Sequence, residues 1–395
     1  MNVTLIGHGF WPLVGGLERQ VYDCAVGLAR RGCAVRVLSI VAEGTDLPAD
    51  EVLHLPGTGP IQVHRAPVLQ PAAPHDPLRE PEIPADAYRQ LAPRWSRLVH
   101  DADVLCTFGA SPALAGDLIK RHLGLPFVAV LPGIPEQADA RFREILCCDA
   151  DLFVGVSRFM CRRAEALYDL HMIPIYNGID TDLFRPTQQA LDYDVLLDLP
   201  GPLITSPVRL DPSKGLDLLL DAFELVSRLR PDATLLITGN GSICHHLGLV
   251  NPYYEHLQRV VQLKELTQQV RFARGAIASR DMPALYTISD LCVMTSVTEG
   301  FGLGLAESLA CETPVVATRT EGMTEIFPDG KAGVYVDRDA TDVAQCLLTL
   351  LGDNALRRRL GRAGRAHIVA SFPLQAQADN YLSLFTSLCT ARIAA

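Results

Sequence analysis

The stretch S-V-T-E-G-F-G-L-G-L-A-E-S-L-A-C-E-T-P-V-V-A-T, from Ser296 to Thr318, decides the fold of this chain. Its glycines predict a loop that opens into a helix, and Thr313-Pro314 predicts the end of that helix. The apolar, β-branched residues from Val315 to Thr318 then predict a buried strand. A helix followed this closely by a strand is typical of α/β folds with a parallel sheet.

Two carboxylates, Glu299 and Glu307, bracket the glycines of this stretch. If both were helical, they would lie roughly 12 Å apart along the axis, too far to share a proton or a metal ion. Backbone N–H groups at Gly300, Gly302 and Gly304 can approach an anion at a helix start. This geometry suggests a sugar at one carboxylate, a diphosphate at the helix start and a ribose at the other carboxylate. The alternative is a glycine-rich turn before an ordinary amphipathic helix with two solvated glutamates.

Length and composition limit the classes of protein that this chain can be. With 395 residues it exceeds what one hydrophobic core usually supports, so we expect two domains. The formal net charge of −10 argues against nucleic acid as a partner. The 11 cysteines are scattered and lack Cys-x-x-Cys spacing, which favours free thiols in a reducing compartment over a zinc site.

The sequence also predicts a cytoplasmic location. No apolar run reaches membrane-spanning length, and no basic leader precedes the first apolar stretch. The basic cluster of Arg158, Arg162 and Arg163 could make a weak peripheral contact with anionic lipid headgroups. The alternative for this cluster is a solvated helix face. The oligomeric state stays open.

The first half of the chain alternates strands and helices. An apolar strand from Val3 to Ile6 leads into a glycine loop, and Gly15-Gly16 then opens a helix that ends near Arg31. A second strand, from Ala34 to Val41, completes a βαβ unit whose loop lies where such folds place ligands. Seven prolines between Pro67 and Pro93 predict an irregular excursion. Further strands are expected in four places: Val104–Thr107, Phe127–Leu131, Leu152–Val156 and Ile173–Tyr176.

The second half repeats the alternation. We expect its strands at Leu203–Ser206, Thr234–Thr238, Val270–Ala273, Leu291–Met294, Val315–Thr318 and Val334–Val336. Alternation throughout implies two mostly parallel, doubly wound sheets, and hence two Rossmann-like domains. The default ligand site of such a pair is the cleft at the carboxyl ends of both sheets.

A basic loop follows the first strand of the second half. Arg209 and Lys214 stand five residues apart, Asp211 is placed to cap the following helix, and Pro212 suits its first position. An Arg can hold two phosphate oxygens while a Lys acts as a point charge, so the pair suits a diphosphate. The alternative is two surface cations before a helix.

Taken together, these segments resemble family-4 retaining glycosyltransferases of the GT-B fold, also described as glycosyl transferases group 1. The resemblance covers nearly the whole chain, and its motifs occur in the family's order. The motifs are Gly15 to Glu18, Asn177 to Pro186, Arg209 to Gly215, Thr238 to Gly241, Tyr286 to Asp290 and the Glu-x7-Glu element from Glu299 to Glu307.

The resemblance implies a role for each matching residue of a nucleotide-sugar site. Arg209 and Lys214 would bind the donor diphosphate, and Glu299 would contact sugar hydroxyls; these three would be the catalytic residues. Glu307 would hold the ribose. The other residues of the donor site would be Gly15, Gly16, Asn240, Gly275, Ile277, Phe301, Gly302, Leu303 and Gly304.

The mechanism that the resemblance implies is retention at the anomeric carbon by front-face displacement. The leaving phosphate would assist deprotonation of the acceptor, which requires stabilisation of the departing charge rather than a pair of carboxylates at glycosidase spacing. Helix N-termini with Arg and Lys can supply this stabilisation, and no Asp-x-Asp metal motif is placed to serve it. We therefore expect a metal-independent enzyme without a cofactor, whose donor substrate is a nucleotide diphosphate sugar.

One element departs from the family pattern. Relatives usually carry a histidine after the strand expected at Phe127–Leu131, whereas this chain has Leu131 and Pro132 there. His8, beside the first glycine loop, could supply a polar contact from a different strand end, although a lone histidine in such a loop is more often structural.

The sequence thus predicts an acceptor domain over residues 1–186, a donor domain over 187–371, and a last helix over 372–395 that crosses back to the first domain. The predicted function is transfer of a sugar from a nucleotide diphosphate sugar to an unidentified acceptor, which could be a glycan, a lipid-linked compound or a small molecule. Because the usual histidine is missing, the alternative is a non-catalytic GT-B protein that binds a nucleotide sugar or a partner protein. An epimerase or hydrolase would need an added acid/base cluster that the sequence does not show.

Overall fold

The structure is a computed structural model, which describes residues 1–13, 15–43, 45–68, 78, 83–196, 199, 201–239, 251–274, 277–320 and 322–394. These residues form two compact units. The N-terminal unit contains the described residues of Met1–Ala73, Glu82–Gly178 and Leu374–Ala395, and the C-terminal unit contains those of Pro74–Pro81 and Ile179–Pro373. The division thus falls at Gly178 rather than at the Pro186 expected from the sequence.

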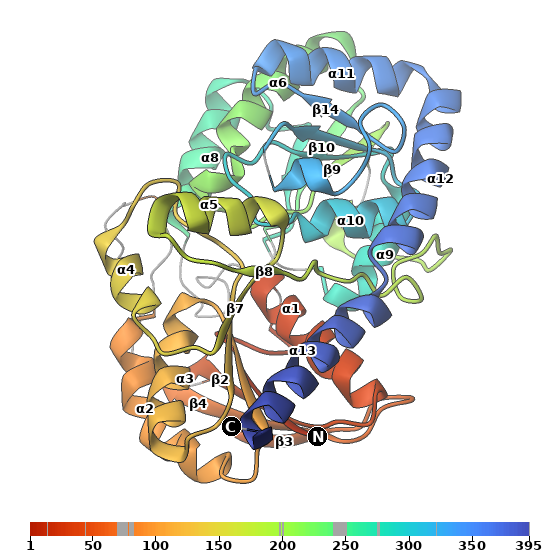
Figure 1. The fold of residues 1–395 in the computed structure, drawn as a ribbon. Helices are drawn as coiled ribbons and strands as arrows, with labels where there is room; N and C mark the ends of the chain where they lie inside the picture. The colour runs from red at the N-terminus through yellow and green to blue at the C-terminus, as the bar shows by residue number, and fades with distance from the viewer. Residues whose placement is uncertain are drawn as a thin grey trace. The chain divides into compact units, whose positions relative to one another are not determined.

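The N-terminal unit is built on a sheet of eight strands in the order β3-β4-β2-β1-β5-β6-β7-β8 (Figure 1). Every neighbouring pair is parallel except β3 with β4, which is antiparallel. The strands are β1 (Asn2–Ile6), β2 (Ala34–Ala42), β3 (Asp50–Leu53), β4 (Ile61–Val68), β5 (Val104–Phe108), β6 (Phe127–Leu131), β7 (Leu152–Gly155) and β8 (Ile173–Pro174). Buried, largely apolar residues fill β5 and β6, as expected for strands covered on both faces.

Six described helices belong to this unit. They are α1 (Gly16–Arg30), α2 (Ala85–Leu98), α3 (Ala110–Leu123), α4 (Ala140–Leu146), α5 (Arg158–Tyr168) and α13 (Leu374–Ala394). The C-terminal helix α13 packs against α1, where Ala378 leaves no space for a side chain at Gly27. Two polar contacts add to this packing: Arg31 pairs with Asp379, and Gln377 accepts a hydrogen bond from the backbone of Gly178 at 2.9 Å.

The C-terminal unit is built on six strands in the order β11-β10-β9-β12-β13-β14, with every neighbouring pair parallel. The strands are β9 (Leu203–Ser206), β10 (Thr234–Ile237), β11 (Val270–Phe272), β12 (Leu291–Met294), β13 (Val315–Thr318) and β14 (Val334–Val336). Its described α-helices are α6 (Leu216–Leu229), α8 (Pro252–Leu263), α9 (Met282–Ile288), α10 (Leu303–Ala310), α11 (Ala340–Gly352) and α12 (Asn354–Ser371). Its described residues also include the 3₁₀ turns η1 (Asp194–Leu196), η2 (Pro212–Lys214), η3 (Ser279–Asp281) and η4 (Met323–Glu325).

The architecture confirms the predicted fold class, two mostly parallel α/β sheets of the Rossmann-like kind. The sequence did not predict β3 and β4, whose residues lack the short apolar run that marks the other strands. The expectation of an irregular segment from Pro67 to Pro93 was wrong at both ends, because Pro67 lies in β4 and α2 begins at Ala85 and contains Pro93. Residues 69–77 and 79–82 of this segment lie outside the described residues. Helix α2 is held in the core by Tyr88 and Trp95, which are almost completely buried.

In each sheet the chain order reverses about one central strand. Strand β1 lies between β2 and β5, and β9 lies between β10 and β12. Open α/β sheets bind ligands beyond the carboxyl ends of the strands at such a point. The loops after β9 and β12 are the basic loop and the glycine-rich stretch that the sequence singled out, so the topology brings these two motifs together.

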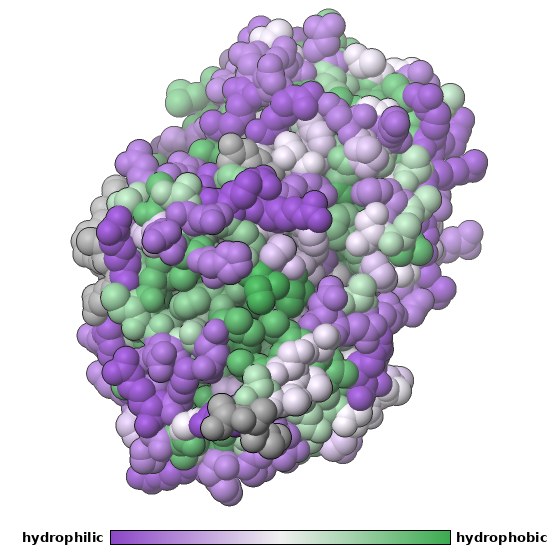
Figure 2. All heavy atoms as spheres, viewed as in Figure 1, coloured by the Kyte–Doolittle hydropathy of each residue, from purple (hydrophilic) through white to green (hydrophobic). Residues whose placement is uncertain are grey.

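One face of the molecule carries both hydrophilic and apolar residues. The face drawn in Figure 2 is largely hydrophilic, with apolar residues gathered over part of the N-terminal unit. Among the helices that the structure describes, none combines the length and the apolar character needed to cross a membrane.

Candidate functional site

The loop after β9 is fixed by its own polar residues. Asp211 accepts hydrogen bonds from the backbone and the hydroxyl of Ser213, and Pro212 opens the 3₁₀ turn η2. Gly215 follows with φ of +64°, where a Cβ would lie 2.1 Å from the carbonyl oxygen of Thr295. Only glycine fits at this position, because both the backbone angle and the close approach exclude a side chain.

The loop after β12 is hydrogen-bonded to the loop after β9. Thr295 donates its hydroxyl hydrogen to the carbonyl of Gly215 at 2.9 Å, and the backbone N–H of Val297 donates to Ser213 at 2.8 Å. The hydroxyls of Thr318 and Thr320 both donate to the carbonyl of Ser296. The two loops therefore form one structural element at the switch point of the sheet.

Within this element, Lys214 and Glu299 form an ion pair. The Nζ–Oε2 distance is 2.7 Å, and the two side chains are only 13% and 17% exposed. Arg209 lies on the same loop, is exposed, and has no ion pair among the residues that the structure describes. An incoming phosphate would therefore meet an exposed guanidinium at Arg209 and compete with Glu299 for Lys214.

The glycine-rich stretch leads into helix α10. Gly302 precedes this helix with φ of +95°, and no described side chain caps its N-terminus. The first N–H groups of the helix, at Leu303 and Gly304, therefore have no side-chain acceptor in the described structure, which suits an anion. Phe301 is buried and packs edge-on against Phe372, so it contributes its backbone rather than its ring to the loop surface.

Glu307 lies farther along α10 and is oriented by a buried tyrosine. The hydroxyl of Tyr286 donates to Glu307 Oε2 at 3.1 Å. Burial, reinforced by the charge of Glu307, raises the pKa of Tyr286 well above its usual value, so this phenol remains a hydrogen-bond donor. Glu299 and Glu307 thus have different partners, as expected if they hold different ends of one ligand.

Asn251 is a positioning residue that the sequence analysis missed. Its side-chain oxygen caps α8 by accepting from the backbone of Tyr254 at 3.0 Å, and its nitrogen donates to the carbonyl of Leu210 at 3.0 Å. Asn251 therefore connects the start of α8 to the residue next to Arg209. The Asn251-Pro252 pair is a helix-start signal that could have predicted the cap, but no local signal predicts the bond to Leu210.

Two of the predicted donor residues, Asn240 and Gly275, lie outside the described residues. Ile277 is fully buried. In the N-terminal unit, Gly15 is the extended N-cap residue of α1 and Gly16 is its first residue, again without a described side-chain cap.

The N-terminal unit offers few polar side chains at the carboxyl ends of β5 and β6. Leu131 is fully buried, and Pro132 and Gly133 follow it in the position where a histidine was expected. His8, after β1, is half-buried and is hydrogen-bonded through Nδ1 to the hydroxyl of Tyr88. In the basic cluster on α5, Arg163 stacks over the ring of Phe159.

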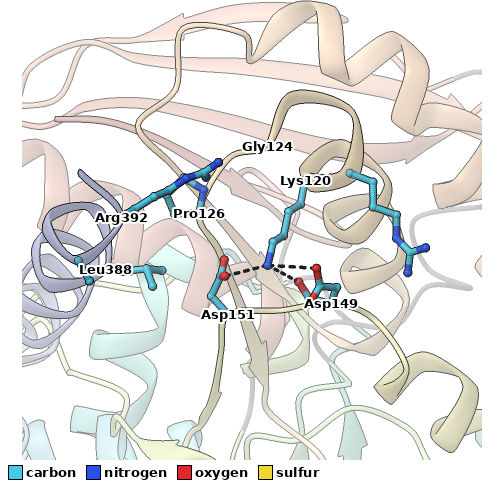
Figure 3. A pocket seen from close by; sticks show the side chains of 9 residues that line it. Lys120, Gly124, Pro126, Asp149, Asp151, Leu388 and Arg392 are labelled. Carbon is cyan, nitrogen blue, oxygen red and sulfur yellow. Dashed lines mark hydrogen bonds and ion pairs between the residues drawn. The ribbon is translucent and has the colours of Figure 1, made fainter. Parts of the chain in front are cut away.

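A cavity of about 440 Å³ lies elsewhere in the N-terminal unit (Figure 3). It is lined by residues at the end of α3, before β6 and β7, and on α13. Lys120 points to Asp149 and Asp151 and is paired with both, at 3.4 and 2.8 Å. The cavity is therefore at the amino ends of the strands, away from the edge where α/β sheets bind their substrates.

Comparison with known proteins identifies the chain. The family described as "Glycosyl transferases group 1" matches residues 191–367, and "Glycosyltransferase Family 4" matches residues 14–183. The chain belongs to the family-4 glycosyltransferases of the GT-B fold. The prediction of a glycosyltransferase that uses a nucleotide-sugar donor is thereby confirmed.

Two curated relatives are similar over most of this glycosyltransferase. The chain is 32% identical over 302 residues to a GDP-mannose-dependent alpha-(1-6)-phosphatidylinositol monomannoside mannosyltransferase of Mycolicibacterium smegmatis, covering 70% of this chain and 74% of the relative. It is 28% identical to a D-inositol 3-phosphate glycosyltransferase of Segniliparus rotundus, covering 94% of this chain and 84% of the relative.

Solved structures share the fold at lower identity. Sucrose-phosphate synthase from Thermosynechococcus elongatus superposes with a TM-score of 0.82 at 20% identity, covering 99% of this glycosyltransferase and all of the other chain (100%). The Anabaena protein HepE, crystallised in complex with UDP-glucose, superposes with a TM-score of 0.73 at 18% identity, covering 98% and 100%.

Proposed function

We propose that this glycosyltransferase transfers its sugar with retention of anomeric configuration and without a metal ion. The observation that carries the proposal is the Lys214–Glu299 ion pair beside the uncapped start of α10. The hydrogen-bonded loops after β9 and β12 thus carry a cation, a carboxylate and a helix N-terminus together. A donor diphosphate would bind Arg209, Lys214 and the N–H groups of the helix start, while Glu299 would turn from Lys214 to the sugar hydroxyls.

In the proposed reaction, the bond between the anomeric carbon and the phosphate oxygen breaks while the acceptor oxygen bonds to the same face of that carbon. The proton of the acceptor hydroxyl moves to the leaving phosphate. Negative charge grows on the diphosphate as the bond breaks, and fixed positive charge is worth most where such charge develops. Lys214 and Arg209 supply that charge, so the step needs no metal ion.

We propose Glu307 as the residue that binds the ribose of the donor. The bond from Tyr286 orients the carboxylate, and an ionised carboxylate is a strong acceptor for hydroxyl groups. The names of the relatives suggest the first donors and acceptors to test. GDP-mannose and UDP-glucose are the donors, and D-inositol 3-phosphate and phosphatidylinositol monomannoside are the acceptors.

The test combines the protein with each donor, with and without each acceptor, and follows release of the nucleotide diphosphate. The anomeric proton coupling of the product, measured by NMR, reports its configuration. A product inverted relative to the donor would contradict retention, and loss of turnover after EDTA treatment would contradict metal independence. If calorimetry shows binding of a nucleotide sugar but no donor-acceptor pair gives turnover, the non-catalytic alternative takes its place.

A further inference from the structure

The loop after β13 packs against the glycine-rich loop after β12. Strand β13 lies next to β12 and ends at Thr318, and the 3₁₀ turn η4 follows at Met323–Glu325. Between them, the hydroxyl of Thr320 donates to the carbonyl of Ser296 at 2.7 Å, and Thr320 is almost completely buried. The loop after β13 is therefore a third element of the C-terminal switch point, beside the loops after β9 and β12.

The two loops approach each other most closely at Gly322. A Cβ atom at this position would lie 1.9 Å from the carbonyl oxygen of Glu299 and 2.9 Å from that of Gly300. The backbone of Gly322 has φ of −66° and ψ of −35°, in the right-handed helical region that residues with side chains adopt readily. The lack of space for a side chain, rather than the backbone angle, is therefore what requires glycine here.

The residues that follow Gly322 anchor this loop in the core of the C-terminal unit. Met323 and Ile326 are fully buried, and the carbonyl of Met323 accepts a hydrogen bond from the hydroxyl of Tyr335. Both side chains also reach the glycine-rich loop, because a Cβ at Gly302 would meet Ile326 Cδ1 at 2.9 Å and Met323 Cγ at 3.3 Å. The surface that Gly322 presents to Glu299 is thus fixed by packing on its other side.

This contact determines where Glu299 lies. A carbon–oxygen contact shorter than 3.0 Å is not tolerated, so a methyl group at Gly322 would force the two loops apart by roughly 1 Å. The Nζ–Oε2 distance between Lys214 and Glu299 is 2.7 Å, and such hydrogen bonds extend only to about 3.2 Å. A displacement of this size is enough to break the ion pair and to move the Glu299 carboxylate.

We propose that Gly322 is a positioning residue for Glu299, the carboxylate that we assign to the sugar hydroxyls of the donor. The inference rests on the proposed function. Because Gly322 has no side chain, the loop after β13 packs directly on the backbone of Glu299 and sets the position of its carboxylate. Gly322 thereby acts on the sugar end of the donor, whereas Arg209 and Lys214, on the loop after β9, bind the diphosphate.

Binding experiments test this role without turnover. Calorimetry compares UDP with UDP-glucose and GDP with GDP-mannose, using the pair that the wild-type protein binds. Gly322→Ala should weaken binding of the nucleotide sugar about 10-fold, the equivalent of one charge-assisted hydrogen bond, and should leave the affinity for the nucleotide diphosphate unchanged. Gly322→Ala combined with Glu299→Ala should bind the nucleotide sugar no more weakly than Glu299→Ala alone, because Gly322 acts through this carboxylate.

Turnover provides the second measurement. A misplacement of about 1 Å at a reacting centre can lower a rate about 100-fold, so we expect a loss of this order in the kcat of Gly322→Ala. The matched control is Gly201→Ala, just before β9, where a Cβ would meet the carbonyl oxygen of Asp232 at 2.4 Å. This variant also introduces a clash with a carbonyl group and should also unfold at lower denaturant concentration, but it should keep the wild-type kcat and both affinities.

A milder variant tests the same contact if Gly322→Ala does not fold. Thr320→Val keeps the shape of the side chain and removes the hydroxyl that donates to Ser296. Loss of one neutral hydrogen bond between the two loops should lower kcat about 5-fold, again without a change in affinity for the nucleotide diphosphate.

The outcomes separate this proposal from the proposed function. A Gly322→Ala variant that keeps the wild-type kcat and affinity for the nucleotide sugar would overturn the proposal, and so would one that loses affinity for the nucleotide diphosphate to the same extent. If Gly322→Ala does not fold, a wild-type kcat in Thr320→Val would overturn it. If the wild-type protein transfers no sugar from any donor, the proposed function fails, whereas the calorimetric comparison still decides whether Gly322 positions Glu299 for the sugar.

Discussion

The two switch points of this glycosyltransferase have the same topology but different chemistry. In the C-terminal unit, the loops after β9 and β12 carry a Lys214–Glu299 ion pair, an exposed Arg209 and a helix N-terminus. In the N-terminal unit, the ends of β5 and β6 are apolar or glycine-rich, and β1 adds one histidine held by Tyr88. One switch point thus offers positive charge to an anion, and the other offers mainly apolar and backbone groups.

The largest effect should come from removing the positive charge of the C-terminal loops. Arg209→Ala combined with Lys214→Ala should lower donor-dependent turnover on the order of 1000-fold, since each charge-assisted contact to a departing phosphate is worth several kcal/mol. Release of nucleotide diphosphate measures the effect.

The matched control removes two other cations of the same unit. Arg228 and Lys264 both pair with Glu224, away from the loops at the switch point. Arg228→Ala combined with Lys264→Ala changes the net charge equally and should leave turnover within about 2-fold, since neither residue belongs to the loops at the switch point. Wild-type turnover in the Arg209/Lys214 variant would show that this loop is not the phosphate site.

The packing between the loops after β9 and β12 can be tested at Gly215. An alanine there should cost about 1–2 kcal/mol for its left-handed backbone, and the clash with Thr295 should add about 1–3 kcal/mol. Gly330 has a similar φ, +69° against +64°, but nothing lies within 4 Å of an added Cβ, so Gly330→Ala isolates the backbone cost. Denaturant unfolding measures both variants, and equal losses would mean that the two loops can separate freely.

The elements around both switch points could be predicted because their signals are local. Strands such as β6 and β9 are short apolar runs bounded by Gly and Pro, and they occur where the sequence predicted them. The glycine-rich stretch and the basic loop were likewise predicted as motifs, and the parallel topology then placed them side by side. Pro93 misled the prediction of α2, because packing of the buried Tyr88 and Trp95 outweighs the helix-breaking tendency of one proline.

The partners that orient the site residues could not be predicted. Asn251 meets Leu210, Tyr286 meets Glu307, and Tyr88 meets His8 across 41, 21 and 80 residues of sequence. Each contact depends on how a helix packs against a loop, which no periodicity or spacing encodes. The sequence therefore predicts the candidate site residues, and the tertiary structure shows which contacts hold them.

The roles proposed for Glu299 and Glu307 can be distinguished by calorimetry with nucleotide diphosphate alone. Glu307→Ala should weaken binding about 10- to 100-fold, because a charged acceptor for the ribose is lost. Glu299→Ala should leave binding unchanged or improve it, because it releases Lys214 from its ion pair. A larger loss of affinity in Glu299→Ala than in Glu307→Ala would mean that Glu299, rather than Glu307, binds the nucleotide end of the donor.

The smallest effect that we expect is that of removing the Asn251 side chain, which supports the loop after β9 in the C-terminal unit. Asn251→Ala and Asp353→Ala each remove an N-cap, from α8 and α12, and should each cost about 1 kcal/mol of stability. Only Asn251 also donates to Leu210, next to Arg209. Asn251→Ala should therefore raise the KM for the donor roughly 5-fold, the equivalent of one neutral hydrogen bond, while Asp353→Ala leaves it unchanged. If both variants raise this KM alike, donor binding by the loop after β9 depends on the stability of the whole C-terminal unit. The hydrogen bond from Asn251 would then have no specific role in positioning Arg209.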